Sequence, residues 1–233
     1  MKHSDTKQLN EHLSSLSSED VLVYCSEVFG NRIAFATSLG LEDQVITHMI
    51  AKQNLNIRIF TLDTGRIFPE TYDLIERTNA RYKINIEIVF PESGEVENMV
   101  NQHGINLFYT SIEHRKQCCY VRKTKPLSKA LSGLDAWITG LRKEQSVTRT
   151  GIETAGWDSI NNLIKINPLI EWSEAEVKAF IMKNNVPYNP LHDKGFPSIG
   201  CQPCTRAVLP GDDIRSGRWW WEHPEQKECG LHK

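Results

Sequence analysis

Cysteines are the residues best suited to chemistry in this chain of 233 residues, which contains six of them. Cys118 and Cys119 are adjacent, and Cys201 and Cys204 form a CxxC motif. Two thiolates with CxxC spacing lie on one side of a turn and can hold one metal ion or one edge of an iron–sulfur cluster. Taken alone, the CxxC motif is equally compatible with a redox dithiol, a zinc site and an iron–sulfur site.

The adjacent pair supplies two further thiolates, so the two pairs suffice for four-cysteine ligation of zinc or of a 4Fe-4S cluster. Neighbouring side chains diverge, which suits a cluster that offers a separate iron to each thiolate better than a small tetrahedral zinc ion. Arg122, Lys123 and Lys125 follow the pair, and nearby cations stabilise a cluster that carries net negative charge. A solvated helix face is the alternative interpretation of this basic run.

The two remaining cysteines stand apart from these pairs. Cys25 falls in an apolar helical pattern, which predicts a buried small side chain. Cys229 lies in the ECGLH tail motif at 228–232, outside any core pattern, and is the candidate catalytic nucleophile. Cysteine attacks as the thiolate, and its ordinary pKa of about 8.5 leaves it mostly protonated. A nearby cation such as His232 would favour the thiolate; an incidental surface thiol and a solvated histidine are the alternatives.

The elements that must position these residues alternate between strand and helix. Apolar patterns predict helices at 21–29, at 45–51, after Pro69 and at 95–103. Strands are expected at 32–37, 57–62, 84–90, 136–139 and 163–166. This alternation predicts an α/β fold with a doubly wound, mostly parallel sheet. Pro, Gly and Trp are dense beyond Pro187, so we expect one domain over 1–233, with an α/β core at 30–186 and a loop-rich segment at 187–233.

Ligands bind at the carboxyl ends of the strands in such sheets, which makes the loops at 38–43, 63–66 and 140–146 the candidate binding loops. The first loop leads from a strand into a helix, where backbone N–H groups and the helix dipole attract anions. It contains a single glycine, Gly40.

Composition excludes several classes of function. The formal net charge is −2, so the bulk charge implies neither a nucleic acid nor an anionic membrane as partner. No apolar run approaches the roughly 18 residues that a membrane span needs, and the polar segment at 1–10 lacks the hydrophobic stretch of a signal peptide. We therefore predict a cytoplasmic protein, in whose reducing environment structural disulfides are not expected.

Several motifs together resemble the assimilatory sulfonucleotide reductases, and specifically the cluster-containing adenylyl-sulfate (APS) reductases. The resemblance covers the chain from about Arg32 onward. Related ATP pyrophosphatases carry a Ser-Gly-Gly-x-Asp-Ser loop, from which the single-glycine loop at 38–43 departs. This departure favours a ligand group smaller than pyrophosphate, or a loop adapted to a nucleoside. The matching segments are KQCCYVRK at 116–123, GCQPCT at 200–205, RSGRWW at 215–220, ECGLH at 228–232, LDTGR at 62–66, the segment 140–146 and NPLHD at 189–193.

This resemblance implies an adenine nucleotide alpha hydrolase-like fold and a thiol-dependent reduction of APS in sulfate assimilation. APS and two thiols would give sulfite, AMP and a disulfide, with thioredoxin or a similar dithiol protein as the reductant. One 4Fe-4S cluster per chain would bind Cys118, Cys119, Cys201 and Cys204, and Cys229 would be the nucleophile. The expected substrate-binding residues are Ser38, Gly40, Asp63, Thr64, Lys123, Arg142, Arg215, Arg218 and His232.

The identity of the substrate leaves alternatives open. 3′-Phosphoadenylyl sulfate (PAPS) carries an extra dianion at the ribose, which Glu42 and Asp43 would repel, so the sequence favours APS; helix capping is the alternative role of this acidic pair. PAPS reduction or dual specificity is the second hypothesis. Other classes are an ATP pyrophosphatase-type adenylating enzyme and a zinc or redox-sensing module. The sequence is compatible with a homo-oligomer.

Overall fold

The computed structural model describes residues 6–145, 152–209 and 211–223. The chain divides into two compact units. The first is drawn from Met1–Thr61, Asp73–Glu87 and Leu131–Asn189, and the second from Leu62–Tyr72, Ile88–Ala130 and Pro190–Lys233. The second unit thus combines the carboxy-terminal segment with two earlier stretches of the chain. The expectation of a single domain over the whole chain stays a prediction.

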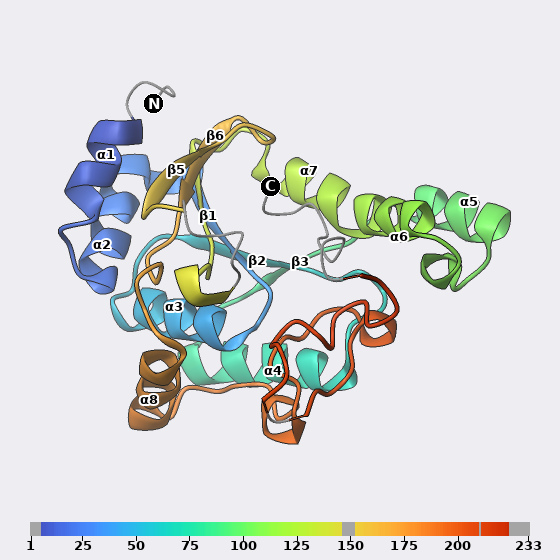
Figure 1. Cartoon of the computed structure of the whole chain (residues 1–233). Helices are drawn as coiled ribbons and strands as arrows, with labels where there is room; N and C mark the ends of the chain where they lie inside the picture. Colours follow the sequence, from blue (N-terminus) through green and yellow to red (C-terminus); the bar gives the residue numbers. More distant parts are fainter. Residues whose placement is uncertain (1–5, 146–151, 210, 224–233) are drawn as a thin grey trace. The chain divides into compact units, whose positions relative to one another are not determined.

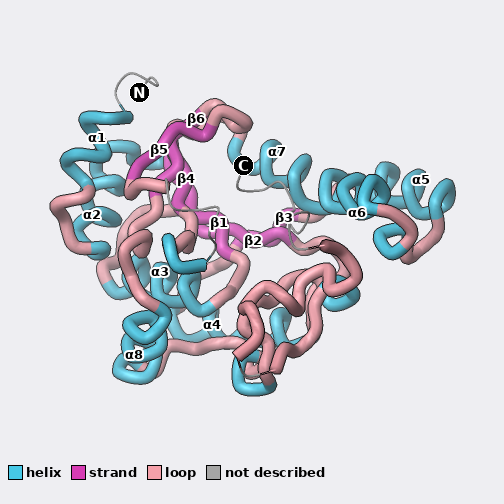
Figure 2. Tube along the Cα trace, in the orientation of Figure 1, coloured by secondary structure: helices cyan, strands magenta, loops and turns pink. Residues whose placement is uncertain are grey.

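A six-stranded sheet runs in the order β3-β2-β1-β4-β6-β5, which Figure 2 shows as neighbouring magenta segments. The pairs β1–β2, β1–β4 and β4–β6 are parallel, whereas β5 is antiparallel to β6 at the sheet edge. The mostly parallel α/β fold is therefore confirmed. The strands are β1 Ile33–Thr37, β2 Arg58–Leu62, β3 Glu87–Val89, β4 Ala136–Ile138, β5 Ala155–Asp158 and β6 Leu163–Ile166.

The helices include those that the apolar patterns predict, and α4 begins at Pro69 as expected. Ser17 caps α2 by accepting a hydrogen bond from the Asp20 amide, and Ser173 and Glu176 form a capping box at α8. Within the described part of the chain, no helix is long and apolar enough to cross a membrane. The helices are α1 Thr6–Leu13, α2 Ser18–Phe29, α3 Leu41–Lys52, α4 Pro69–Tyr82, α5 Ser93–His103, α6 Ile112–Cys119, α7 Lys125–Leu131 and α8 Glu174–Asn184.

The core of the first unit lies between the central strands and the helices packed on them. Phe35 of β1 and Trp137 of β4 are almost completely buried, and α3 packs against α2 and α8 (Figure 1). Full burial of one such apolar side chain contributes about 1.5–3 kcal/mol. Cys25 of α2 belongs to this core, and burial raises the pKa of its thiol to about 12. The prediction of a buried Cys25 is confirmed.

The core of the second unit includes the cysteines that the motifs mark as ligands. Helices α5 and α6 and the segment after Asn189 contribute one buried cluster, formed by Met99, Leu107, Phe108, Cys118, Cys119, Cys204 and Trp219. The described part of the chain after Asn189 contains only short 3-10 turns and one bridge between Thr205 and Arg218, so it is loop-rich as predicted. The predicted ligands therefore lie in the core of this unit.

Candidate functional site

The two cysteine pairs converge in the core of the second unit. Cys118, Cys119 and Cys204 are each at most 8% exposed, and Cys201 packs against the same cluster. The thiol of Cys118 interacts electrostatically with that of Cys201, and the thiol of Cys204 with those of Cys201 and Cys119. All four are free cysteines. Thiols from distant parts of the sequence thus share one small buried volume.

The adjacent pair ends α6 and precedes a π-helical turn, Tyr120–Thr124. Consecutive side chains on an α-helix point about 100° apart. Cys118 and Cys119 therefore enter the shared core from different directions, as the divergence argument predicts. π-Helical turns are rare and are frequently found at functional sites. This one directly follows the pair and contains Lys123.

The CxxC motif is held by a compact turn. Cys204 N–H donates to the Cys201 carbonyl at 2.9 Å, and the Thr205 hydroxyl donates to the same carbonyl at 2.9 Å. Gly200 N–H in turn donates to the Thr205 hydroxyl at 3.2 Å. These bonds close the loop on itself, which holds both thiols in place for ligation.

The loop after β2 connects both cysteine pairs. Arg122 Nη1 donates to the Thr64 carbonyl at 2.6 Å, and the Thr64 hydroxyl lies 3.2 Å from Cys201 Sγ. Gln202 N–H donates to the Arg66 carbonyl at 2.8 Å. Asp63 shapes the loop, because it accepts the Gly65 amide at 2.7 Å and the Tyr72 hydroxyl at 2.9 Å. Asp63 and Thr64, both expected to bind substrate, are buried here as parts of this connecting loop.

Cations surround the thiols and alter their proton affinity. Burial raises the pKa of Cys201, but Lys123, the Thr64 hydroxyl and Arg218 more than offset it, so its pKa lies below the usual value. Burial and the neighbouring Cys201 raise the pKa of Cys204 to about 12. One thiolate therefore disfavours deprotonation of the next. The positive charge of a bound metal centre would offset this repulsion and keep each coordinating thiol deprotonated.

The donor set fits a four-thiolate cluster. A single zinc ion binds sulfur at about 2.3 Å, so its tetrahedral ligands lie within about 4 Å of one another. Among the described residues, no group of three or more His, Cys, Asp or Glu side chains is arranged to hold one metal ion. Four free thiols gathered around one buried cluster match the number of donors that a four-cysteine centre needs.

Arg218 is a second predicted substrate-binding residue beside the cysteines, in addition to Lys123. It is 8% exposed, its guanidinium carbon lies 4.8 Å from the centre of the Trp219 ring, and a Cβ on Gly200 would lie 2.3 Å from its Nη2. Only Gly200 therefore admits the guanidinium so close to the CxxC turn. Its buried Nε has no hydrogen-bond partner among the described residues. Arg215 is half-buried, and its amide donates to Asp213 at 2.7 Å.

In the first unit, the loop after β1 is closed by Asp43. This carboxylate accepts the Ser38 amide at 2.5 Å and the Ser38 hydroxyl at 2.7 Å, while Gly40 occupies the N-cap of α3. Burial raises the pKa of Asp43 to about 6, against the opposing effect of the Ser38 hydrogen bonds. A Cβ on Gly140 would lie 2.2 Å from Asp43 Oδ1, so the backbone after β4 approaches this carboxylate as only glycine allows.

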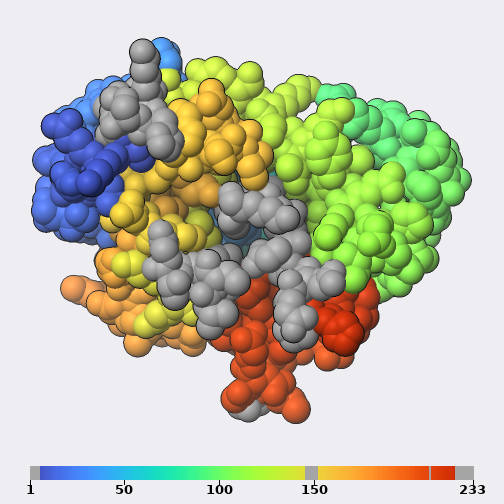
Figure 3. Space-filling model, turned by 45° about the horizontal axis from the view of Figure 1, so that its top comes forward, coloured from blue at the N-terminus to red at the C-terminus, as the bar shows by residue number. Residues whose placement is uncertain are grey.

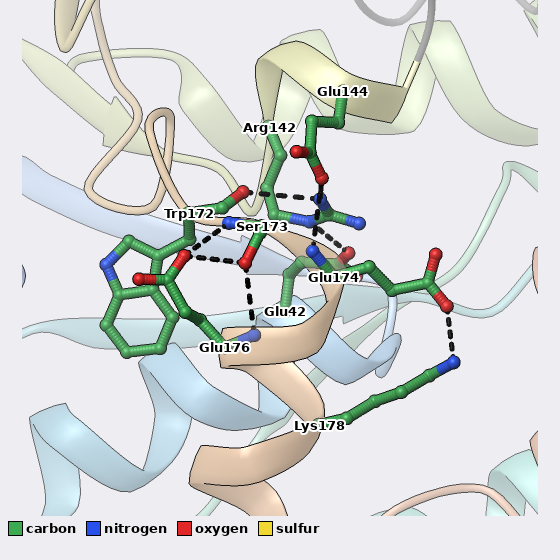
Figure 4. Close-up of polar contacts among 8 residues, drawn as sticks. All are labelled: Glu42, Arg142, Glu144, Trp172, Ser173, Glu174, Glu176 and Lys178. Atoms are coloured by element: carbon green, nitrogen blue, oxygen red, sulfur yellow. Dashed lines mark hydrogen bonds and ion pairs between the residues drawn. The ribbon is translucent and has the colours of Figure 1, made fainter.

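Arg142 lies in a network of ion pairs and hydrogen bonds (Figure 4). Its Nε donates to Glu42 at 2.7 Å, and its Nη1 donates to Glu144 at 3.1 Å and to the Trp172 carbonyl at 3.3 Å. Glu144 also accepts the Glu174 amide at the start of α8, at 3.1 Å. The Arg142 side chain is only 3% exposed. The guanidinium thus ties the loop after β4 to α3 and α8.

This network changes the electrostatic argument about the acidic pair. Glu42 is neutralised by Arg142, and Asp43 is buried against Ser38. Both carboxylates lie in the first turn of α3, and Asp43 accepts a backbone hydrogen bond from Gly40, the N-cap residue, so a capping role is compatible with the structure. Neither presents an unpaired negative charge for a ribose phosphate. The sequence does not predict the role of Gly140, whose backbone closely approaches Asp43, beyond placing it in a candidate binding loop.

Two predicted site residues, Cys229 and His232, lie outside the described residues.

This chain is similar in sequence to one family of known proteins. The model of the phosphoadenosine phosphosulfate reductase domain matches residues 32–207. A protein from Allochromatium vinosum named adenosine 5′-phosphosulfate reductase is 54% identical over 209 residues, which are 90% of this chain and 81% of that protein.

Two solved structures are similar in fold. The phosphoadenylyl-sulfate (PAPS) reductase of Candida auris, in a phosphate complex, gives a TM-score of 0.77 at 32% identity and covers 89% of this chain and 98% of its own. Yeast FAD synthetase gives a TM-score of 0.57 at 15% identity, over 86% and 67% of the two chains, and shares the fold alone. The resemblance to the sulfonucleotide reductases that the motifs indicate is confirmed, whereas the iron–sulfur cluster stays a prediction.

Proposed function

Because this chain belongs to the phosphoadenosine phosphosulfate reductase family, we propose that it reduces adenylyl sulfate to sulfite and AMP in assimilatory sulfate reduction. The observation that carries the proposal is the convergence of Cys118, Cys119, Cys201 and Cys204 in one buried core beside Lys123 and Arg218. The relative from Allochromatium vinosum, named an adenosine 5′-phosphosulfate reductase, supports it at 54% identity.

The four cysteines would hold one 4Fe-4S cluster per chain. Their burial, their free thiols and the surrounding cations support this assignment. When bound, the cluster would supply a negatively charged centre that ties the end of α6 to the CxxC turn. With all four thiols engaged, none of them competes with Cys229 as a nucleophile. A reducing compartment would keep these thiols available, so we propose a cytoplasmic location.

Cys229 would carry the substrate sulfur through the reaction. Its thiolate attacks the sulfur of APS, a sulfur–sulfur bond forms, and the sulfur–oxygen bond breaks with its electron pair leaving on the phosphate of AMP. A thiolate of a dithiol protein such as thioredoxin then attacks Cys229 Sγ, and sulfite departs with the electron pair of the cleaved bond. The second thiol of that protein resolves the mixed disulfide, which regenerates the Cys229 thiolate and leaves the partner oxidised.

Cations of the second unit would hold the phosphosulfate. Arginine forms bidentate contacts with phosphate and sulfate oxygens. The buried Arg218, whose Nε has no partner among the described residues, is the best placed of them. Lys123 lowers the pKa of Cys201 and would share its charge with a bound anion. The remaining proposed substrate contacts are Ser38, Gly40, Asp63, Thr64, Arg142, Arg215 and His232.

We propose APS rather than PAPS as the substrate, on the basis of sequence identity. Because Glu42 is paired with Arg142, repulsion of a ribose phosphate by that carboxylate no longer supports the choice. The higher identity to a relative named for APS, 54% against 32% to the Candida auris PAPS reductase, favours APS. PAPS reduction is the second candidate. Comparing kcat/KM for the two nucleotides decides between them.

Mass spectrometry of the protein mixed with APS in the absence of reductant tests the central step. We expect an added mass of one sulfite group on the peptide that contains Cys229, together with one equivalent of AMP. Cys229→Ser should show neither, whereas Cys25→Ser, which alters a buried thiol of the first unit, should behave as the wild type. An adduct on another cysteine, or AMP release without any adduct, would falsify the proposal.

A further inference from the structure

A buried ion pair in the second unit joins α6 to a segment near its carboxy-terminal cysteine motif. Arg115 Nε donates to Glu222 Oε1 at 3.0 Å, and Arg115 Nη2 donates to Glu222 Oε2 at 2.8 Å. The two side chains are 0% and 3% exposed. In Figure 3 the red segment that ends at His223 lies against the green surface of the α6 region. This bidentate geometry is the strongest form of such a pair.

Arg115 also contacts one of the proposed cluster ligands. Arg115 and Cys119 are four residues apart on α6, a spacing that brings two side chains to the same face of a helix. The guanidinium donates a hydrogen bond to the Cys119 thiol in addition to its bonds with Glu222. Hydrogen bonds from a charged donor are stronger than those from a neutral one. One face of α6 therefore presents both a ligand and a donor that orients it.

Glu222 is connected to the other cysteine pair through Trp219. The Trp219 backbone N–H donates to the Cys204 carbonyl at 3.2 Å, and the Trp219 carbonyl accepts the Glu222 amide at 2.9 Å. Trp219 is 1% exposed, and the centre of its ring lies 4.8 Å from the guanidinium carbon of Arg115. Its φ of 40° is a conformation that a bulky residue keeps only where its surroundings fix it. A continuous series of contacts thus runs from Cys119 on α6 to Cys204 in the CxxC turn.

The ion pair supplies a hydrogen-bond donor without net charge. Glu222 offsets the positive charge of Arg115, and a buried charge that loses its partner is strongly unfavourable. Lys123 and Arg218, by contrast, lie near Cys201 and are proposed to share their charge with the substrate. The pair is therefore suited to holding the ligands in place, whereas the two other cations are suited to attracting an anion.

We propose that Arg115 and Glu222 are positioning residues that hold Cys119 and Cys204 in the arrangement needed to bind one metal centre, and thereby set how firmly the chain retains it. The inference rests on the proposed four-cysteine cluster. Loss of the partners that orient metal ligands typically lowers metal affinity by roughly 10- to 100-fold. We therefore expect iron to leave at least about ten-fold faster when the pair is removed.

Two variants and one control test the inference. The double variant Arg115→Met with Glu222→Leu removes one positive and one negative charge, so the net charge is unchanged and no charge stays buried alone. Glu222→Gln keeps the shape of the side chain and leaves the Arg115 cation uncompensated. Glu92→Gln removes the exposed pair with Lys129 in the same unit and is the matched control. Three quantities are measured in the whole protein, purified anaerobically: the rate of iron loss to a chelator, the reduction potential of the cluster, and the free energy of unfolding in urea.

We expect the double variant to bind iron and to lose it to the chelator at least about ten-fold faster than the wild type. Its reduction potential should fall, because a donor to a ligating sulfur stabilises the more negative, reduced state of a cluster. Glu222→Gln should shift the potential upward instead, because it leaves a cation beside that sulfur. Glu92→Gln should match the wild type in all three measurements.

The reduction potential separates positioning of the ligands from a purely structural role. A pair that only stabilised the fold would change the free energy of unfolding on removal and leave the potential unchanged. An unchanged potential in the double variant, or iron loss as slow as in the wild type, would overturn the inference; the double variant decides alone if Glu222→Gln does not fold. A wild type that binds no iron would instead overturn the proposed cluster, and the role of the pair with it.

Discussion

The two regions that carry the candidate residues treat charge in opposite ways. In the first unit, Arg142 is neutralised by Glu42 and Glu144, and Asp43 is buried against Ser38. In the second unit, Lys123 and Arg218 lie near the Cys201 thiol and lower its pKa. The first region is therefore electrostatically complete without a ligand. The second has cations arranged for a negatively charged group, which is what a four-thiolate cluster and a phosphosulfate both provide.

Loss of one proposed cluster ligand should have the largest effect. We expect Cys201→Ser to lose iron, the broad absorbance near about 400 nm that a cluster gives, and all APS reduction, because three thiolates and a hydroxyl cannot replace the four-cysteine set. Absorbance and iron analysis of anaerobically purified protein measure this. Cys25→Ser, buried in the first unit, is the control and should keep both. A colourless wild type with stoichiometric zinc would remove the cluster from the proposal.

Substitution of Arg142 tests whether this side chain stabilises the fold of the first unit or binds the substrate. Arg142→Met leaves Glu42 without its partner in a largely buried position, so we expect the free energy of unfolding to fall by about 3 kcal/mol. The exposed pair of Lys178 and Glu174, also drawn in Figure 4, is the control. Lys178→Met should cost less than about 1 kcal/mol. Urea unfolding monitored by circular dichroism measures both. A small loss for Arg142→Met, with a large loss of APS affinity, would show that this guanidinium serves the ligand instead.

Asp43 gives the first region a dependence on pH. Its pKa is raised from 3.8 to about 6, so the folded state binds a proton more tightly than the unfolded state. The resulting stabilisation is complete below pH 3.8 and is lost as the pH rises through about 6. Between pH 7 and pH 5 the wild type should gain about 1.4 kcal/mol relative to Asp43→Asn.

Urea unfolding at the two pH values measures that difference. Asp73→Asn, on the exposed side of α4, is the control, and its difference from the wild type should stay constant with pH. If the difference in free energy of unfolding between the wild type and Asp43→Asn also stayed constant with pH, burial would not raise the pKa of Asp43.

Local pattern predicts most of the fold and fails where long-range pairing decides. Strands with apolar runs, such as β1 and β6, were predictable within about one residue. Strand β5 has the sequence Ala-Gly-Trp-Asp, which lacks a β-branched residue, and it forms because it pairs with β6 at the edge. Helix α6 is mostly polar, and the residues it buries are Arg115 and the two cysteines. A buried arginine is not predictable from its neighbours in sequence, because Glu222 compensates its charge from far along the chain.

In the candidate sites, too, local motifs are predictable from sequence and long-range contacts are not. The motifs marked the cysteines that converge, because ligand type and spacing are local properties of the chain. The motifs could not show that Glu42 is neutralised, because Arg142 is 100 residues away in sequence. The loop after β2 was expected to bind substrate, and its bonds to both cysteine pairs depend on three separate segments of the second unit.

Lys123 should give the smallest effect and the sharpest test of the contrast between the two regions. If its cation acts from its particular position beside Cys201, Lys123→Gln should lower kcat/KM for APS about five-fold, equivalent to about 1 kcal/mol for a half-buried charge, with iron retained. Lys125 lies nearby in sequence but is exposed and paired with Glu95, so Lys125→Gln should change kcat/KM by less than about two-fold. Steady-state kinetics at two salt concentrations distinguish a specific role of Lys123 from a general effect of positive charge. Equal losses that disappear at high salt would mean that the second region acts through its overall charge, and the placement of individual cations around the thiols would then carry no specific role.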